Sequence, residues 1–137
     1  MNDKIFVDTN IWIYLFSDDK KSKYSRLVID SNFDNIIVST QVLNELFNVI
    51  AIKHKLMSKT DAKFIIKEIM ENFYVSIVNT DTILKAIDLS NKYQLSYFDS
   101  LMIASALLEN CSKFYSEDMH NGLLIENKFK ITNPLVS

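Results

Sequence analysis

Near the start of the chain stands the stretch Ile5-Phe6-Val7-Asp8-Thr9-Asn10, a short apolar run followed at once by a carboxylate and two polar side chains. A run of this kind predicts a buried strand over residues 4–7, which ends at Asp8. In parallel α/β sheets, functional side chains gather beyond the carboxyl ends of the strands. Asp8 is therefore a candidate site residue, and equally a candidate N-cap for a helix that begins at Thr9.

The rest of the chain alternates short apolar runs with helical patterns. Further strands are predicted at residues 36–38, 74–78, 113–115 and 129–131, and helices at 9–16, 21–29, 40–55, 58–70, 80–93 and 98–109. This alternation is typical of an α/β fold with a mainly parallel sheet that helices cover on both faces. We expect a three-layer αβα sandwich, formed by a single domain over residues 1–137.

The composition excludes several classes of protein. Gly122 is the only glycine, so the chain has neither a P-loop nor a dinucleotide-binding glycine motif. Cys111 is the only cysteine, which excludes an intramolecular disulfide and predicts a small buried side chain rather than a catalytic thiol. No signal peptide or membrane-spanning run is recognisable, so we expect a soluble protein of the reducing cytoplasm.

The charge is slightly acidic and unevenly distributed. The formal net charge of −2 argues against a protein that coats nucleic acid, although a nuclease with acidic metal ligands remains compatible with it. Residues 20–26 contain three lysines and Arg26, and residues 53–59 contain three lysines and His54. Either group can steer a phosphate backbone toward a site, while solvated helix surfaces are the simpler interpretation of each.

Glu45 is the second candidate acid. It lies in the predicted helix 40–55, where an advance of about 100° per residue places Gln41, Glu45, Asn48 and Ile52 along one line. The rest of this helix is strongly apolar. The line is therefore either a thin solvated stripe or the polar wall of a site.

Two more acids follow toward the end of the chain. Asp99 lies at the start of helix 98–109 on a stripe of apolar residues, where a carboxylate is costly unless it is paired, caps the helix or binds a cation. Asp118 follows the strand 113–115 within a turn-like segment. Its neighbour Glu117 competes for the same role, but its side chain is expected to point elsewhere.

Four stretches together resemble the PIN-domain proteins, above all the VapC-type toxins. They are residues 5–10, 39–46, 97–106 and 115–119 with Gly122, and they contain the four candidate acids in the family's order and spacing. The resemblance covers essentially the whole chain. One departure is that His120 and Asn121 precede the glycine, where the family often has a histidine directly before it.

The resemblance implies an endoribonuclease that hydrolyses RNA by attack of water, without a covalent enzyme intermediate. Asp8, Glu45, Asp99 and Asp118 would be its catalytic acids, with polar neighbours that orient them: Thr9, Asn10 and Ser116. It also implies a cognate antitoxin as partner and a homodimer, with no membrane partner.

Chemistry supports a metal among these acids. Two carboxylates at about 5 Å repel by roughly 3 kcal/mol at an effective dielectric near 20, so a cluster needs a cation or protons. Oxygen ligands alone favour Mg²⁺ or Mn²⁺. We expect Asp8 and Asp99 to be the main ligands, with Glu45 and Asp118 completing the set, and His54 and His120 to be surface histidines rather than general bases.

Other classes of protein also have acidic sites at strand ends, and the residues after Asp8 distinguish two of them from this chain. A receiver-type phosphorylation domain requires adjacent acids after the first strand, where this chain has Thr9 and Asn10. A dehalogenase-like phosphatase requires a second aspartate at the position of Asn10. A PIN-fold binding module without catalysis, and a nuclease directed at DNA, remain open alternatives.

Overall fold

A central parallel sheet organises the computed structural model, which describes residues 3–135. Its six strands have the order β3-β2-β1-β4-β6-β5, and only β5 is antiparallel to its neighbour. The strands are β1 (Ile5–Val7), β2 (Ile36–Ser39), β3 (Tyr74–Ser76), β4 (Lys113–Tyr115), β5 (Leu124–Ile125) and β6 (Phe129–Thr132). The predicted mainly parallel sheet is confirmed.

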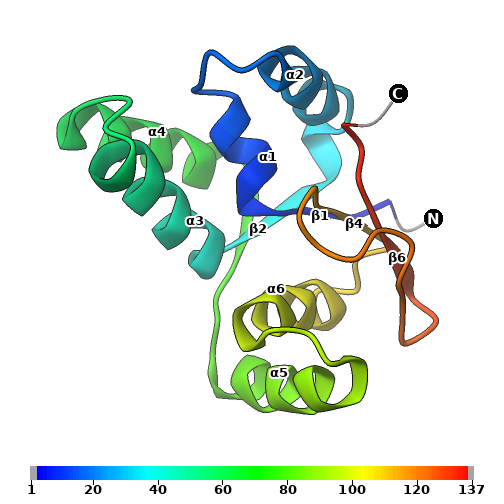
Figure 1. The fold of residues 1–137 in the computed structure, drawn as a ribbon. Helices are drawn as coiled ribbons and strands as arrows, with labels where there is room; N and C mark the ends of the chain where they lie inside the picture. The colour runs from blue at the N-terminus through cyan, green and yellow to red at the C-terminus, as the bar shows by residue number, and fades with distance from the viewer. Residues whose placement is uncertain (1–2, 136–137) are drawn as a thin grey trace.

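Helices cover both faces of the sheet, as Figure 1 shows. One face carries α1 (Thr9–Tyr14), α2 (Lys21–Ser31), α3 (Thr40–Phe47) and α4 (Lys59–Asn72). The other carries α5 (Thr80–Tyr93) and α6 (Tyr97–Leu108). Two short elements complete the chain: the 3₁₀-helix η1 (Phe33–Asn35) and the π-helix η2 (Asn48–Lys53). The three-layer αβα arrangement expected from the sequence is therefore present.

The core lies between the layers and follows from the apolar runs of the strands. All residues of β1 and β2 are buried, because both faces of these central strands are covered. Phe6 of β1 stacks on Phe114 of β4 with ring centroids 5.2 Å apart. Residues 100–106 of α6 are buried without interruption, since α6 lies between the sheet and α5. A helix that is apolar on all sides is typical of such a position.

Side-chain caps fix where the helices of the site begin. Asp8 caps α1, Ser39 caps α3 and Ser96 caps α6, and each accepts a hydrogen bond from a backbone N–H of its helix. Asp8 and Ser39 also stand at the carboxyl ends of the neighbouring strands β1 and β2. The same strand ends thus position the polar side chains and the helices that follow them.

The predicted helix 40–55 is present as far as Lys53, but it changes type in its second half. The α-helix ends at Phe47 and continues as η2, in which His54 N–H donates to the carbonyl of Val49, five residues back, at 2.9 Å. This wider turn keeps Ile50 and Ala51 buried. The strand predicted over 74–78 also ends earlier, at Ser76, and β5 and η1 were not predicted.

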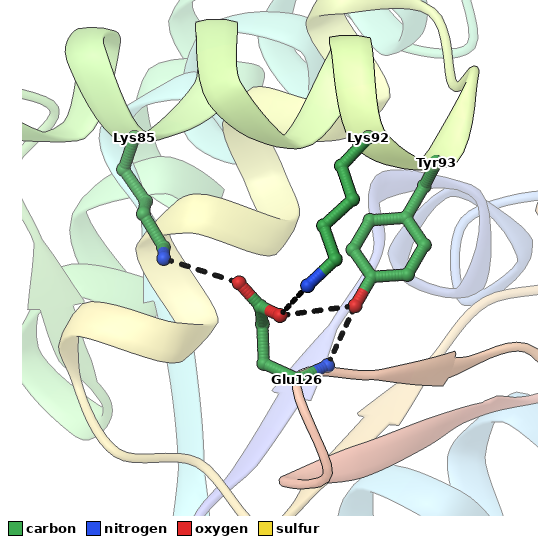
Figure 2. Close-up of polar contacts among 4 residues, drawn as sticks. All are labelled: Lys85, Lys92, Tyr93 and Glu126. Carbon is green, nitrogen blue, oxygen red and sulfur yellow. Dashed lines mark hydrogen bonds and ion pairs between the residues drawn. The ribbon is translucent and has the colours of Figure 1, made fainter.

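The β5–β6 hairpin is tied to α5 through Glu126 (Figure 2). Its carboxylate receives Lys92 Nζ at 2.6 Å, Lys85 Nζ at 3.4 Å and the hydroxyl of Tyr93 at 3.1 Å, while its backbone N–H donates to the same hydroxyl at 2.9 Å. Glu126 and Asn127 have φ values of 50° and 56°, as the two central residues of a type I′ turn have, and the Lys128 N–H closes this turn to the Ile125 carbonyl at 2.8 Å. The contacts of Glu126 join the hairpin to α5.

Two further expectations concern Cys111 and the membrane. Cys111 is buried, and burial first, with Glu109 nearby, raises the pKa of its thiol to about 12. The prediction of a small core side chain is thus confirmed. Within residues 3–135, no helix combines the length and the apolar character needed to cross a bilayer.

Candidate functional site

Asp8 is the most enclosed acid of the site. Asp8 is 6% exposed, and its carboxylate accepts hydrogen bonds from the Thr9 backbone N–H at 2.6 Å and from the Ser116 hydroxyl at 2.7 Å. Both roles considered for Asp8 are therefore compatible, because one oxygen caps α1 while the other lies against the end of β4. Burial is the main reason that the pKa of Asp8 is raised to about 6; the two hydrogen bonds oppose this rise, and the charges of Asp99 and Glu45 add to it.

Glu45 faces the site from α3 and is held by two neutral side chains. Thr9 Oγ1 donates to its Oε1 at 3.3 Å, and Gln41 Nε2 donates to its Oε2 at 3.0 Å. The same Gln41 amide donates to the backbone carbonyl of Phe98 at 3.0 Å, which links α3 to the first turn of α6. Gln41 Oε1 is buried without a hydrogen-bond partner among the described residues.

Asp99 enters from the first turn of α6. As the sequence suggested, it shares a face of this helix with Met102, which lines the same cavity. Asp99 is nevertheless only partly buried, and Ser96 rather than Asp99 caps the helix. Partial burial, and then the charge of Asp118, keep the pKa of Asp99 above its ordinary value against the opposing hydrogen bond of Ser96.

Asp118 and its neighbour Glu117 point in different directions, as expected. Asp118 is exposed and lines the same cavity as the other acids. Glu117 instead accepts a hydrogen bond from the Tyr14 hydroxyl at 2.6 Å and pairs with Lys21 at 2.5 Å. Partial burial opposes its ionisation, yet these two partners lower the pKa of Glu117. Its charge is thus engaged outside the site.

One cavity of about 330 Å³ brings the four predicted acids together. Its wall includes Asp8, Glu45, Asp99 and Asp118, which come from four separate segments of the chain. The polar remainder of the wall is Thr9, Asn10, Gln41, Asn48 and Lys53. Larger hollows exist elsewhere on the described surface, but the acids converge on this one.

The donor set of this cavity suits a hard divalent cation. It offers carboxylate and amide oxygens and neither cysteine nor histidine. The carboxylates are close enough for the charges of Asp99 and Glu45 to raise the pKa of Asp8, which is the repulsion that a cation would relieve. As they stand, however, no three Asp, Glu, His or Cys side chains within residues 3–135 surround one common point. The ligand atoms therefore suit a divalent cation by their chemistry. For a cation to bind, the carboxylates must move closer to one another.

The three predicted neighbours of the acids are found beside them. Thr9 and Ser116 make the contacts to Glu45 and Asp8 described above, and Ser116 is fully buried. Asn10 lines the cavity and its Oδ1 accepts from the Glu117 backbone N–H at 3.5 Å. The two histidines, His54 and His120, are exposed and do not line the cavity.

The polar line predicted in helix 40–55 reaches the cavity with one exchange at its end. Gln41 and Asn48 belong to the polar line predicted along helix 40–55, and both line the cavity, whereas Ile52 does not. Lys53 takes its place, although the sequence only marked it as one member of a basic group. The sequence contains no pattern that predicts the π turn, and this turn places Lys53 rather than Ile52 in the wall.

Comparisons with known proteins agree with this architecture. The family model described as PIN domain matches residues 5–120. The chain resembles VapC20 of Mycobacterium tuberculosis, a sarcin-ricin loop cleaving toxin, with a TM-score of 0.69, 19% identity and coverage of 84% of this chain and 90% of that one. No curated protein sequence matches the chain.

Two toxin–antitoxin structures share the fold as well. A toxin–antitoxin complex from Klebsiella pneumoniae gives a TM-score of 0.73 at 17% identity, with coverage of 96% of this chain and 98% of that one. VapBC-1 from nontypeable Haemophilus influenzae gives 0.61 at 18% identity, with coverage of 83% and 86%. At such identities the likeness concerns the fold.

Proposed function

The chain belongs to the PIN domain family, and we propose that it is a divalent-metal-dependent endoribonuclease with Asp8, Glu45, Asp99 and Asp118 as its catalytic acids. The observation that carries the proposal is the meeting of these acids, from four segments, in the wall of one cavity. We extend this function to residues 1–137 as one nuclease domain.

Each acid has a task that its surroundings support. We assign Asp8 and Asp99 as the main ligands of Mg²⁺ or Mn²⁺, with Glu45 and Asp118 completing the set. The chemistry that such a cation supplies is the acidification of water and the stabilisation of charge on phosphate oxygens. The chain's own contribution is orientation: Ser116 and the Thr9 N–H fix Asp8, and Gln41 fixes Glu45.

The surroundings of Asp8 also suit it to respond to a cation. With a pKa of about 6, this carboxyl is mostly ionised at pH 7.5 yet carries an electrostatic cost in doing so. A cation that removes this cost is bound more tightly than the same carboxylates would bind it in water. The raised pKa of Asp8 thus favours the binding of a cation beside its carboxylate.

The preference for RNA and a role as a toxin are supported by the structural relatives. VapC20 is described as a toxin that cleaves the sarcin-ricin loop, and the other relatives above are toxin–antitoxin assemblies. We propose that this chain likewise acts on RNA, is held by a cognate antitoxin protein and forms a homodimer.

The test is cleavage of labelled RNA by the purified chain with EDTA, Mg²⁺ or Mn²⁺. We expect metal-dependent products from the wild-type chain and none from the double variant Asp8→Asn, Asp99→Asn. The double variant Glu71→Gln, Asp88→Asn is the matched control, because it removes two exposed carboxylates on α4 and α5 outside the site. Cleavage that persists in the first double variant would contradict the site, and absence of metal binding and cleavage in the wild type would favour a non-catalytic binding module.

A further inference from the structure

Lys53 is the one basic side chain in the wall of the acidic cavity, as far as the structure describes it. It stands at the last position of η2 and is exposed. The ion pairs found among residues 3–135 are made by Lys21, Lys85 and Lys92. Lys53 thus lines the cavity and makes no ion pair with the carboxylates of its wall, as far as the structure describes them.

The π turn determines which residue takes this place. In a regular α-helix, at about 100° per residue, Ile52 lies within about 20° of the direction of Glu45 and Lys53 about 80° away from it. A turn closed by i→i−5 hydrogen bonds holds roughly one more residue, so each residue advances by only about 80°. Over residues 48–53 this brings Lys53 to within about 20° of Glu45.

The lining of the cavity agrees with this geometry. Gln41, Glu45, Asn48 and Lys53 all contribute to the wall, whereas Ile52 lies outside it and is 41% exposed. The hydrogen bond from His54 N–H to the Val49 carbonyl, 2.9 Å long, closes the π turn directly after Lys53. The turn therefore exchanges an apolar side chain for a cation at the edge of the acidic site.

A nucleic-acid strand requires such a cation here. The four carboxylates of the wall repel phosphate, and a divalent cation compensates only part of their charge. A lysine is a compact point charge on a flexible stem, well suited to one phosphate oxygen. Lysine contacts of this kind dominate the affinity for a phosphate backbone whatever its sequence.

We propose that Lys53 contacts a backbone phosphate of the RNA strand bound at the four carboxylates, and that the π turn of η2 is the device that presents it. This inference rests on the proposed function and adds to it the residue that engages the substrate. The contact concerns the phosphate and not the base, so it is the same for every sequence.

The experiment compares four chains in the non-cleaving background Asp8→Asn, Asp99→Asn, with a fluorescein-labelled single-stranded RNA of mixed sequence as the probe. They are the parent, Lys53→Met, the exchange Ile52→Lys with Lys53→Ile, and Lys67→Met as a control that removes an exposed lysine of α4 outside the cavity. The exchange variant keeps the charge and moves it by one position.

We expect Lys53→Met to weaken binding about tenfold to a hundredfold, the range for a charge-assisted hydrogen bond. The slope of log affinity against log salt should fall by about 0.7, the value for one phosphate contact on a single strand. The exchange variant should behave like Lys53→Met, and Lys67→Met like the parent. With the catalytic acids restored, Lys53→Met should lower kcat/KM for RNA cleavage to a similar degree.

Three results would overturn the inference. If the slope of log affinity against log salt is unchanged in Lys53→Met, no phosphate contact has been lost. Parental binding by the exchange variant means that the position set by the π turn is irrelevant. An equal loss in Lys67→Met means that only the overall charge matters. In each case metal-dependent cleavage by the wild-type chain would leave the proposed function intact, whereas a wild-type chain that neither binds nor cleaves RNA would remove both.

Discussion

The hydroxyl of Ser116 donates a hydrogen bond of 2.7 Å to Oδ2 of Asp8, although 108 positions separate the two residues in the chain. The contact exists because β1 and β4 are parallel neighbours, with Val7 beside Tyr115 at their carboxyl ends. The same hydroxyl accepts a hydrogen bond from the Met119 N–H at 3.3 Å. One buried side chain thus connects the enclosed acid at β1 with the loop that carries Asp118.

Replacement of this hydroxyl should destabilise the chain. Ser116→Ala removes a buried hydrogen bond to a charged group and leaves the Met119 N–H without its acceptor, so the free energy of unfolding at pH 8 should fall by about 1–3 kcal/mol. Urea denaturation measures the loss. Ser105→Ala is the control, because Ser105 is equally buried but donates only to the Leu101 carbonyl of its own helix. Equal effects of the two substitutions would contradict the role of Ser116.

The ionisation of Asp8 should make stability depend on pH. Its pKa is raised from 3.8 to about 6 in the folded chain, so the folded state favours the protonated form. This contribution is fully present below pH 3.8, is lost as pH rises through about 6, and amounts to about 3 kcal/mol. In EDTA, Asp8→Asn should therefore gain about 3 kcal/mol relative to the wild type between pH 4 and pH 8. A constant difference across this range in denaturation experiments would argue against the raised pKa.

Divalent cations should stabilise the folded chain. At a concentration of 100 times its Kd, Mg²⁺ or Mn²⁺ should add about 2.7 kcal/mol to the free energy of unfolding at pH 8. The gain should shrink at pH 5, where Asp8 is mostly protonated, and vanish in Asp8→Asn, Asp99→Asn. Thermal melts with and without metal provide the measurement. An equal rise in Tm in this double variant would mean that the cation binds elsewhere.

Gln41 should support activity more than stability. Gln41→Ala frees the carboxylate of Glu45 and cuts the link to the Phe98 carbonyl, so kcat/KM for RNA cleavage should fall about tenfold, while the free energy of unfolding changes by less than about 1.5 kcal/mol. Asn44→Ala is the control on the same helix, since Asn44 is exposed and lies outside the wall of the acidic cavity. Should both variants cleave RNA like the wild type, Gln41 has no part in orienting Glu45.

The ion pairs of Glu126 with Lys85 and Lys92 should slow local opening of the β5–β6 hairpin. Glu126→Gln keeps the backbone bond to Tyr93 but loses the ion pairs to Lys92 and Lys85, so amides of β5 and β6 should exchange faster with deuterium. The hydrogen bond from Lys92 is the first cause of the lowered pKa of Glu126, so this contribution is present above pH 4.5 and is lost as pH falls below it. Exchange rates at pH 7 that match those of the wild type would show that the ion pairs do not hold the hairpin.

Much of this architecture follows from local patterns. The apolar runs predicted the strands β1, β2 and β4, and Asp8, directly behind the first run, caps α1 as the sequence allowed. The polar line predicted along helix 40–55 was right for Gln41, Glu45 and Asn48, because the chain is a regular α-helix up to Phe47.

The parts that were missed depend on long-range pairing or on a change of helix type. The bond between Ser116 and Asp8 follows from the register of two strands that are distant in sequence. The cavity at the start of α6 leaves Asp99 only partly buried, although Met102 of the same stripe also lines its wall. The two-residue strand β5 is too short for alternation to reveal it.

The π turn also bears on the history of the chain. A turn that holds one extra residue is equivalent to a single-residue insertion in a regular helix, here within Asn48–Lys53. A relative whose helix continues as a regular α-helix would therefore align with this chain only across a one-residue gap. Without that gap, Ile52 would stand opposite the relative's cavity residue, and Lys53 would be mistaken for a variable surface position.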